Sequence, residues 1–322
     1  QRRQLGTADA LKMVMGLLND KFLMISGDVI IRKEEIRHLI AEDDITMSII
    51  RVDDASGLGV VETQGERVVR IYEKMDNPPS KLANSGVYLF TPDIFDAVAQ
   101  TTPSSRGEYE ITDSIQKVID TGHKVLHYEI QFWLDFSYPW DLLKANELMM
   151  KSLKPQIDGE VEQNTVLKGA MSIGKNTVVR SGSYIVGPVR IGENCEIGPN
   201  CYIRPSTSIG DGCHVGASVE VKNSIIMNGS KVPHLNYVGD SVIGENCNLG
   251  AGTKIANLKL DKSNVVVGGI DTGRRKLGAI IGDNVQTGIN ASINIGSVIG
   301  NDVMVGPGAL AHGIIAPKSR IL

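Results

Sequence analysis

The sequence has no run of 18 apolar residues, and neither sign of charge is in large excess. A helix that spans a bilayer needs about 20 predominantly apolar residues in succession, so no membrane-spanning helix is expected. The 33 Lys and Arg residues stand against 37 Asp and Glu, a net charge of −4. This balance gives no general attraction to nucleic acid or to an anionic membrane, so any phosphate-bearing ligand must be bound by a local site.

A convincing secretory signal is also missing, because Asp9 and Lys12 interrupt the apolar stretch near the start of the chain. We therefore expect a cytoplasmic protein whose ligands are small molecules. Cysteine is scarce, and the spacing of the four residues fits no zinc site. Buried, reduced thiols are expected, although one pair, separated by a whole number of sequence repeats, could lie within reach of a disulfide. The four are Cys195, Cys201, Cys213 and Cys247, and the pair is Cys195 and Cys213.

Beyond residue 161, an aliphatic residue recurs at every sixth position. The column runs without a break from Val161 to Val221 and resumes at Ile243, and Thr287 falls on the same register after Ile281. A period of six fits neither an amphipathic helix nor a half-buried strand. It fits a solenoid in which each hexapeptide forms one side of a triangular coil. Glycine often follows the aliphatic residue, which suits corners that need a positive φ.

The column loses step between Val221 and Ile243, because their separation in sequence is not a multiple of six. The sequence therefore predicts a protruding stretch between them. His234 lies in this stretch, in "VPHLNYVGDS". A histidine at an irregular corner is either a packing residue or a functional one, and the spacing alone does not decide between them.

The first half of the chain follows another pattern. Apolar runs such as "KFLMIS" and "SGVYLF" alternate with helical stretches, and a last helix is expected over about residues 140–153. This alternation predicts an α/β domain with a largely parallel sheet. The predicted domains are residues 1–154 and 155–322.

Two aspartates directly follow apolar runs in the first domain, Asp28 in "SGD" and Asp135 in "WLD". At the carboxyl end of a parallel strand an Asp faces the ligand crevice, where it can hold a divalent metal over phosphates. Taken singly, each aspartate is equally typical of a turn or a helix cap.

Seven segments of the first domain resemble those of a known family. "QLGTADA", "SGD", "SGLGVV", "YEK", "NSGVYLF", "GEYEITD" and "WLD" resemble the sugar-1-phosphate nucleotidylyltransferases in order and spacing. The resemblance implies a Rossmann-like nucleotidyltransferase fold in which a sugar 1-phosphate attacks the α-phosphorus of UTP or dTTP and pyrophosphate leaves. It assigns nucleotide contacts to Gln1, Gly6 and Thr7, shared Mg²⁺ binding to Asp28 and Asp135, and the sugar side to Gly59, Glu73, Asn84 and Thr112.

One departure from the family stands at the start of the chain. The family opens with a strand and a Gly-rich loop whose Arg and Lys grip the triphosphate, and no such segment precedes Gln1. We expect the chain to be incomplete at its N-terminus and inactive in nucleotidyl transfer as it stands. The alternative is a protein that does not perform this half of the chemistry.

The solenoid carries a second resemblance. "IRPSTSIGDGCHVGASVEVKNS" and "VPHLNYVGDSVIGENCNLGAGTKIANLK" resemble the left-handed parallel β-helix of bifunctional N-acetylglucosamine-1-phosphate uridylyltransferase/glucosamine-1-phosphate acetyltransferases, in particular their archaeal type. The resemblance implies acetyl transfer from acetyl-CoA to an amino-sugar 1-phosphate, gluco or galacto, with His234 as the general base. It places Asn257 near the base, the sugar phosphate at Arg204, Lys222, Tyr237 and Asn248, and acetyl-CoA at Ala251 and Thr287. The family's lysine just beyond the Asn is unmatched in spacing; Lys259 and Lys262 are only neighbours.

The basic stretch "DTGRRKLG" has two interpretations. Arg274, Arg275 and Lys276 lie either on a solvated loop or against a phosphate of coenzyme A or of the sugar. The second interpretation includes a contact across a subunit interface, because the resemblance implies a homotrimer through the β-helix.

Two other functions are compatible with a solenoid of this kind. The β-helix of a nucleotidylyltransferase can serve only for oligomer assembly or regulation. Zinc carbonic anhydrases use the same solenoid, but the three histidines of this one, His214, His234 and His312, share neither one side of a coil nor the spacing that would bring three ligands together.

Overall fold

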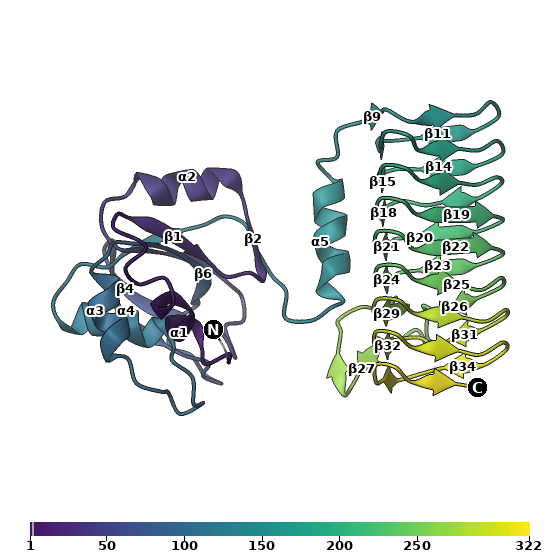
Figure 1. Cartoon of the computed structure of the whole chain (residues 1–322). Helices are drawn as coiled ribbons and strands as arrows, with labels where there is room; N and C mark the ends of the chain where they lie inside the picture. Colours follow the sequence, from purple (N-terminus) through teal and green to yellow (C-terminus); the bar gives the residue numbers. More distant parts are fainter. Residues whose placement is uncertain (2) are drawn as a thin grey trace. The chain divides into compact units, whose positions relative to one another are not determined.

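The computed structural model describes residue 1 and residues 3–322. The chain forms two compact units, residues 1–136 and 137–322, and each is described by itself (Figure 1). Helix α5 (Asp141–Met150) belongs to the second unit by its contacts, although the predicted boundary followed it. The reason is apolar packing, because Trp140 and Leu143 share a buried cluster with Val242 of the solenoid.

The first unit is built on a six-stranded sheet with the order β1-β6-β3-β7-β5-β4. Its strands are β1 (Phe22–Ile25), β3 (Thr46–Arg51), β4 (Val60–Gln64), β5 (Arg67–Tyr72), β6 (Leu82–Phe90) and β7 (Leu126–Glu129). Strands β2 (Val29–Ile31) and β8 (Trp133–Asp135) form a separate antiparallel pair. The helices are α1 (Thr7–Lys12), α2 (Lys33–Ala41), α3 (Ile94–Gln100) and α4 (Ile111–Asp120).

The expectation of a largely parallel sheet was wrong. Strands β1 and β3 run in the same direction, as the strand-helix-strand pattern predicts, but the long strand β6 lies between them and is antiparallel to both. In the part of the chain that the structure describes, β3 with β7 is the one parallel pair of this sheet. Alternation of strands and helices does not reveal which later strand enters between two earlier ones.

The second unit is a parallel β-helix with three faces, which confirms the solenoid prediction. The first face contains β9 (Gln156–Ile157), β12 (Met171–Ile173), β15 (Val189–Ile191), β18 (Thr207–Ile209), β21 (Ile225–Ile226), β24 (Val242–Ile243), β29 (Ala279–Ile281), β32 (Ser297–Ile299) and β35 (Ile314–Ile315). The second face contains β10 (Glu160–Val161), β13 (Val178–Val179), β16 (Glu196–Ile197), β19 (His214–Ala217), β22 (Lys231–His234), β25 (Asn248–Leu249), β30 (Gln286–Thr287), β33 (Met304–Val305) and β36 (Arg320–Ile321). The third face contains β11 (Val166–Lys168), β14 (Tyr184–Val186), β17 (Tyr202–Ile203), β20 (Glu220–Lys222), β23 (Tyr237–Gly239), β26 (Lys254–Ile255), β31 (Ser292–Ile293) and β34 (Leu310–Ala311).

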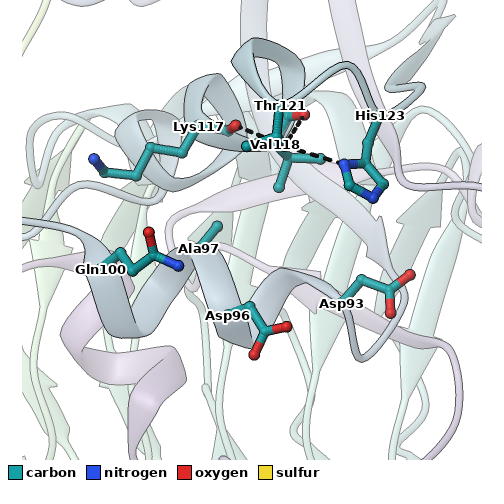
Figure 2. Close-up of a pocket in the computed structure, with 8 residues that line it drawn as sticks. All are labelled: Asp93, Asp96, Ala97, Gln100, Lys117, Val118, Thr121 and His123. Atoms are coloured by element: carbon teal, nitrogen blue, oxygen red, sulfur yellow. Dashed lines mark hydrogen bonds between the residues drawn. The ribbon is translucent and has the colours of Figure 1, made fainter.

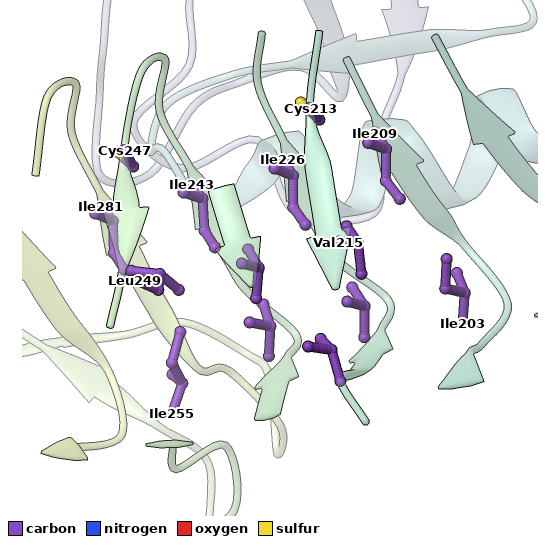
Figure 3. Close-up of a cluster of buried hydrophobic side chains, with 14 of the residues drawn as sticks. Ile203, Ile209, Cys213, Val215, Ile226, Ile243, Cys247, Leu249, Ile255 and Ile281 are labelled. Atoms are coloured by element: carbon purple, nitrogen blue, oxygen red, sulfur yellow. The ribbon is translucent and has the colours of Figure 1, made fainter. Parts of the chain in front are cut away.

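The aliphatic column forms the interior of the β-helix. Ile197 pairs with Val179 on the preceding coil and with Val215 on the following coil, and all three are fully buried. Figure 3 shows the stacked side chains of the central coils, with Cys213 and Cys247 beside them. All four cysteines are buried and free, as expected.

The expected positive φ of the glycine after the aliphatic residue occurs at Gly198, with a φ of 97°, but other corners use asparagine instead. In "IGENCE", Gly192 does not have a positive φ, whereas Asn194 has a φ of 56°. Glycine is needed at 192 for another reason, because a Cβ there would lie 2.2 Å from Oδ1 of Asp211 and 2.7 Å from the backbone of Gly210. The side-chain amide of asparagine makes it one of the few residues that adopt the left-handed conformation readily.

The predicted protrusion between Val221 and Ile243 was also wrong. The chain keeps to the coil, and strand partners there, such as Glu220 with Tyr237 and Ile225 with Val242, are closer in sequence by one position than partners on the regular coils. Two consecutive corners between the third and first faces are each one residue short. Asn223 and Asp240 occupy these corners, with φ values of 44° and 51°.

The true insertion lies later, between β26 and β29, where paired residues such as Ile243 and Ile281 are more than two coil lengths apart in sequence. It contains the short hairpin β27 (Val266–Val267) and β28 (Ile270–Asp271). Val265 and Leu277 of this insertion pack with Trp140 beside α5, against outward side chains of the first face. The insertion and α5 therefore cover the same face. No helix in the described residues is long and apolar enough to cross a bilayer.

We expect the inward column to dominate the stability of this unit. Ile243 is completely buried, so Ile243→Ala should lower the free energy of unfolding by about 2–5 kcal/mol. Ile157→Ala is the control, because Ile157 is 52% exposed. Thermal unfolding followed by circular dichroism measures both, and equal midpoints for the two variants would contradict the expectation.

Candidate active sites

A polar cluster lies on the third face of the β-helix, at the corner where that face meets the first. Arg204 donates from Nη1 to Oε1 of Glu220 at 2.8 Å and lies over the ring of Tyr202, 5.6 Å from its centroid. Tyr202, Glu220 and Tyr237 stack in register on adjacent coils. The structure thus brings three of the residues predicted to bind the sugar phosphate, Arg204, Lys222 and Tyr237, onto neighbouring strands of one face.

Asp240 is the centre of this cluster, and its side chain is only 3% exposed. Its Oδ2 accepts hydrogen bonds from Nζ of Lys222 at 2.8 Å and from Nδ2 of Asn257 at 2.6 Å. Its Oδ1 accepts one from Nδ2 of Asn223 at 2.9 Å. A buried carboxylate is stable only when it is paired and hydrogen-bonded, and here one carboxylate holds three side chains. Asp240 was not among the site residues predicted from the sequence.

The hydroxyl of Tyr237 belongs to the same cluster. Nδ2 of Asn257 donates to it at 3.1 Å. Burial raises the pKa of Tyr237, and the negative charges of Glu220 and Asp240 raise it further, so the phenol remains a hydrogen-bond donor at neutral pH. The missing side chain of Gly239 makes room here, because a Cβ at that position would lie 2.5 Å from Nδ2 of Asn257 and 2.7 Å from the Tyr237 oxygen.

His234 lies at the other edge of the third face, where β22 ends. Its side chain is exposed, its carbonyl accepts a bond from the Gly252 amide at 3.0 Å, and Leu235 after it has a φ of 52°. In the described part of the chain, the imidazole makes no hydrogen bond to protein. Nζ of Lys254 donates to the carbonyls of Leu235 and Gly252, so a lysine that the sequence analysis passed over fixes the backbone around His234.

Two further predicted residues lie on the coil that follows His234. Asn248 is exposed on β25, in register with Lys231 of β22. Ala251 lies at the following corner, and its carbonyl oxygen accepts a hydrogen bond from the backbone N–H of Asn290 at 2.8 Å. Both are on the His234 side of the β-helix.

Thr287 and Arg274 take part in packing. Thr287 is 6% exposed in the inward column, where its hydroxyl lies 2.7 Å from that of Thr253. Arg274 donates from Nη2 to Oε1 of Glu147 on α5 at 2.6 Å, and Arg275 beside it is exposed. The ion pair of Arg274 joins the insertion to α5.

In the first unit, the four residues predicted to contact the sugar of the nucleotidyl site lie close together. The hydroxyl of Thr112 donates to Oε1 of Glu73 at 2.7 Å, and the backbone N–H of Asn84 donates to the Gly59 carbonyl at 2.8 Å. A Cβ on Gly59 would lie 3.3 Å from Oε1 of Glu73. Nδ2 of Asn84 also donates to the hydroxyl of Tyr88 at 2.7 Å, a residue that the sequence analysis missed.

The electrostatics around Glu73 are unusual for a surface carboxylate. Burial raises its pKa, against the opposing effect of the Thr112 hydrogen bond. A cavity of about 430 Å³ adjoins it and is lined by Glu73, Lys74, Ser104, Ser105, Arg106, Glu110 and Asp113. Several donors and acceptors therefore converge on a space of the size of a small polar ligand.

The segment predicted to contact the nucleotide packs against the start of α4. Oγ1 of Thr7 accepts a bond from the Ile111 amide at 2.9 Å. Gly6 has a φ of 112°, and a Cβ there would lie 2.5 Å from the Tyr109 carbonyl oxygen. Nε2 of Gln1 donates to the Gly6 carbonyl at 3.0 Å. Gln1, Gly6 and Thr7 therefore lie near Thr112.

Asp28 and Asp135 lie side by side. Val29 pairs with Asp135 across β2 and β8, and the Phe136 amide donates to the Asp28 carbonyl at 2.9 Å. Among the described residues, no group of three or more His, Cys, Asp or Glu is arranged to hold a metal. Two carboxylates fit Mg²⁺, which is usually bound by one or two carboxylates, with waters and substrate phosphates completing the shell.

A separate pocket of about 210 Å³ lies between α3 and α4 (Figure 2). It is lined by Asp93, Asp96, Ala97, Gln100, Lys117, Val118, Thr121 and His123. None of the predicted site residues belongs to it.

Known proteins match both units. The nucleotidyl transferase family matches residues 1–152, and the GMPPB C-terminal domain family matches residues 185–321. The bifunctional protein GlmU of Methanococcus maripaludis is 42% identical, over 100% of this chain and 79% of its own length. The bifunctional sugar-1-phosphate nucleotidylyltransferase/acetyltransferase of Sulfurisphaera tokodaii is 43% identical, over 91% of this chain and 75% of its own.

The chain belongs to this family of bifunctional enzymes. A glucose-1-phosphate thymidylyltransferase of Streptomyces antibioticus is also similar, with 36% identity over 89% of this chain and 71% of its own. Membership confirms the class of enzyme predicted from the sequence, a sugar-1-phosphate nucleotidylyltransferase joined to an acetyltransferase.

Proposed function

We propose that the β-helix transfers an acetyl group from acetyl-CoA to the amino group of an amino-sugar 1-phosphate, with glucosamine 1-phosphate as the first acceptor and galactosamine 1-phosphate as the second. The observation that carries this proposal is the cluster around Asp240, which gathers Lys222, Asn257 and Tyr237 beside Arg204. Cations and a hydroxyl donor on one surface are suited to bind a phosphate.

In the proposed reaction, Lys222, Arg204 and the Tyr237 hydroxyl hold the phosphate of the acceptor. The amino nitrogen attacks the thioester carbon, the new C–N bond forms, and the C–S bond breaks. His234 takes the proton that the nitrogen loses and then gives a proton to the departing thiolate, so that coenzyme A leaves as the thiol. An exposed imidazole is suited to this task because its unprotonated nitrogen can accept a proton from the attacking amine.

The placement of His234 favours a site shared between copies of the chain. His234 lies before β23 and Asp240 after it, so the whole width of the third face, about 20 Å of extended chain at most, separates the base from the phosphate cluster. We therefore propose a closed homotrimer in which His234 of one copy faces the Asp240 cluster of the next.

For the first unit, we propose Mg²⁺-dependent nucleotidyl transfer from UTP or dTTP to a sugar 1-phosphate, a reaction that also requires a triphosphate-binding loop of the kind that the family carries. Asp28 and Asp135 would hold the ion, which when bound neutralises charge on the phosphates. Gln1, Gly6 and Thr7 would contact the nucleotide. Four further residues would orient the sugar: Gly59, Glu73, Asn84 and Thr112. We propose a cytoplasmic location, because acetyl-CoA and nucleoside triphosphates are the proposed substrates.

The alternative is a nucleotidylyltransferase whose β-helix serves only for assembly, and the similarity to a thymidylyltransferase favours it. Incubation of the chain with acetyl-CoA and glucosamine 1-phosphate separates the two. Release of the free thiol of coenzyme A, dependent on the amino sugar and absent with glucose 1-phosphate, is the expected result. No thiol release with either hexosamine phosphate would leave the alternative standing.

A further inference from the structure

We propose that Asp240 is a positioning residue of the acetyl-acceptor site, which orients Lys222 and Asn257 for the substrate without touching it. This inference deepens the proposed acetyl transfer and rests on it. It begins from burial: the Asp240 side chain is 3% exposed and that of Lys222 is 18% exposed. The carboxylate is therefore covered by the groups that it binds.

The carboxylate fixes the orientation of the Asn257 amide. A carboxylate only accepts hydrogen bonds, so the nitrogen of Asn257, and not its oxygen, must face Asp240. The same nitrogen donates to the Tyr237 hydroxyl, so both amide hydrogens are used. The Asn257 oxygen is left to accept a hydrogen bond from a ligand, which a substrate amino group can supply.

Lys222 is held in a comparable way. An ammonium has three N–H donors, and the Lys222 bond to Asp240 uses one of them. A long lysine side chain held at its tip loses less conformational freedom when it binds a phosphate. Asp240 therefore presents a donor, from Lys222, and an acceptor, from Asn257, to one ligand.

The backbone around Asp240 is specialised for this role. Asp240 and Asn223 occupy the two short corners with positive φ, and the Asp240 amide donates to the Lys222 carbonyl at 2.9 Å. Asn194 has a positive φ at a regular corner as well, so what distinguishes the corners of Asn223 and Asp240 is the missing residue and not the backbone conformation. Asn223 also donates to Oε1 of Glu147 at 3.0 Å, so α5 supports the corner from outside.

The test is Asp240→Asn in the full chain, with initial rates of thiol release measured against both substrates. In Asp240→Asn, the new side-chain NH2 group faces one of the three donors, Lys222, Asn223 or Asn257, and cannot accept its hydrogen bond. The kcat/KM for glucosamine 1-phosphate should therefore fall by about 10- to 100-fold. KM for acetyl-CoA should stay within about twofold, which a general loss of structure would not allow. Asp283→Asn is the matched control, because Asp283 accepts a backbone bond from Glu245 at another corner, and it should keep wild-type kinetics.

Coupling gives a second readout. Asp240→Asn should cost less in the Lys222→Ala background than in the wild-type chain, because only the part of its effect that acts through Asn257 remains there. Independent, multiplying losses would overturn the inference, as would an unchanged acceptor kcat/KM in Asp240→Asn or an equal loss for both substrates.

A second variant covers the case in which Asp240→Asn does not fold. Asn223→Gly keeps the left-handed corner and removes one donor to Asp240. A loss of several-fold in acceptor kcat/KM is expected, and no loss would overturn the inference. A wild-type chain without acetylation would instead overturn the proposed function, so the two failures are distinguishable.

Discussion

Replacing His234 with alanine should lower the rate of acetyl transfer by about 10²- to 10⁴-fold, the range expected when a general base is lost. The amino group of the acceptor must lose a proton as the C–N bond forms, and His234 is the exposed imidazole beside the Asn248 and Ala251 coil. The measurement is thiol release at saturating acetyl-CoA and amino-sugar phosphate.

His214→Ala is the matched control for this variant. His214 lies on the same face of the β-helix, one coil earlier, and its Nδ1 is 3.6 Å from the Glu196 carboxylate. It should keep the wild-type rate and an unchanged unfolding midpoint. If His234→Ala keeps full activity, His234 is not the base, whatever happens at His214.

Two inactive variants should restore each other when they share an oligomer. His234→Ala and Lys222→Ala chains, co-expressed in equal amounts, should give about a quarter of the wild-type activity. The reason is that a site between neighbouring copies contains both intact residues in one of four random pairings. The assay is again thiol release from the unfractionated mixture; in mixed trimers purified through two different affinity tags, one site of the three is intact and about a third of the activity is expected.

The separate variants, mixed after purification under conditions without exchange of subunits, are the control and should stay inactive. An oligomer of mixed chains with no activity would place the whole site in one chain. A mass equal to that of a single chain, measured by light scattering, would exclude the shared site directly.

The inward column of the β-helix could be predicted because its signal is chemical and repeated. An aliphatic residue at every sixth position has one simple explanation, and Ile197, Val215 and Ile243 are buried where the period puts them. The short corners could not be predicted in this way. The gap between Val221 and Ile243 is equally compatible with one protruding loop and with two corners that each lack a residue, and local sequence does not distinguish them.

The candidate sites show the same limit. Glu73, Asn84 and Thr112 were named from their motifs, and the structure brings them together. Asp240 was not, although it lies in the conspicuous "VGD" segment, because its importance comes from burial and from partners at 222, 223 and 257. Contacts between residues on successive coils depend on the register of the strands. The irregular spacing between Val221 and Ile243 prevented that register from being predicted.

The packing of α5 and the insertion has a consequence for assembly. Trp140, Val265 and Leu277 cover the outward side of the first face, so that face is occupied by the chain itself. Its described residues do not cover the other two faces in this way, and the edge that these two share is the one that carries His234. The docking of one helix on the wall of a solenoid thus limits how its copies can meet and keeps the reactive edge among the surfaces still available for contact.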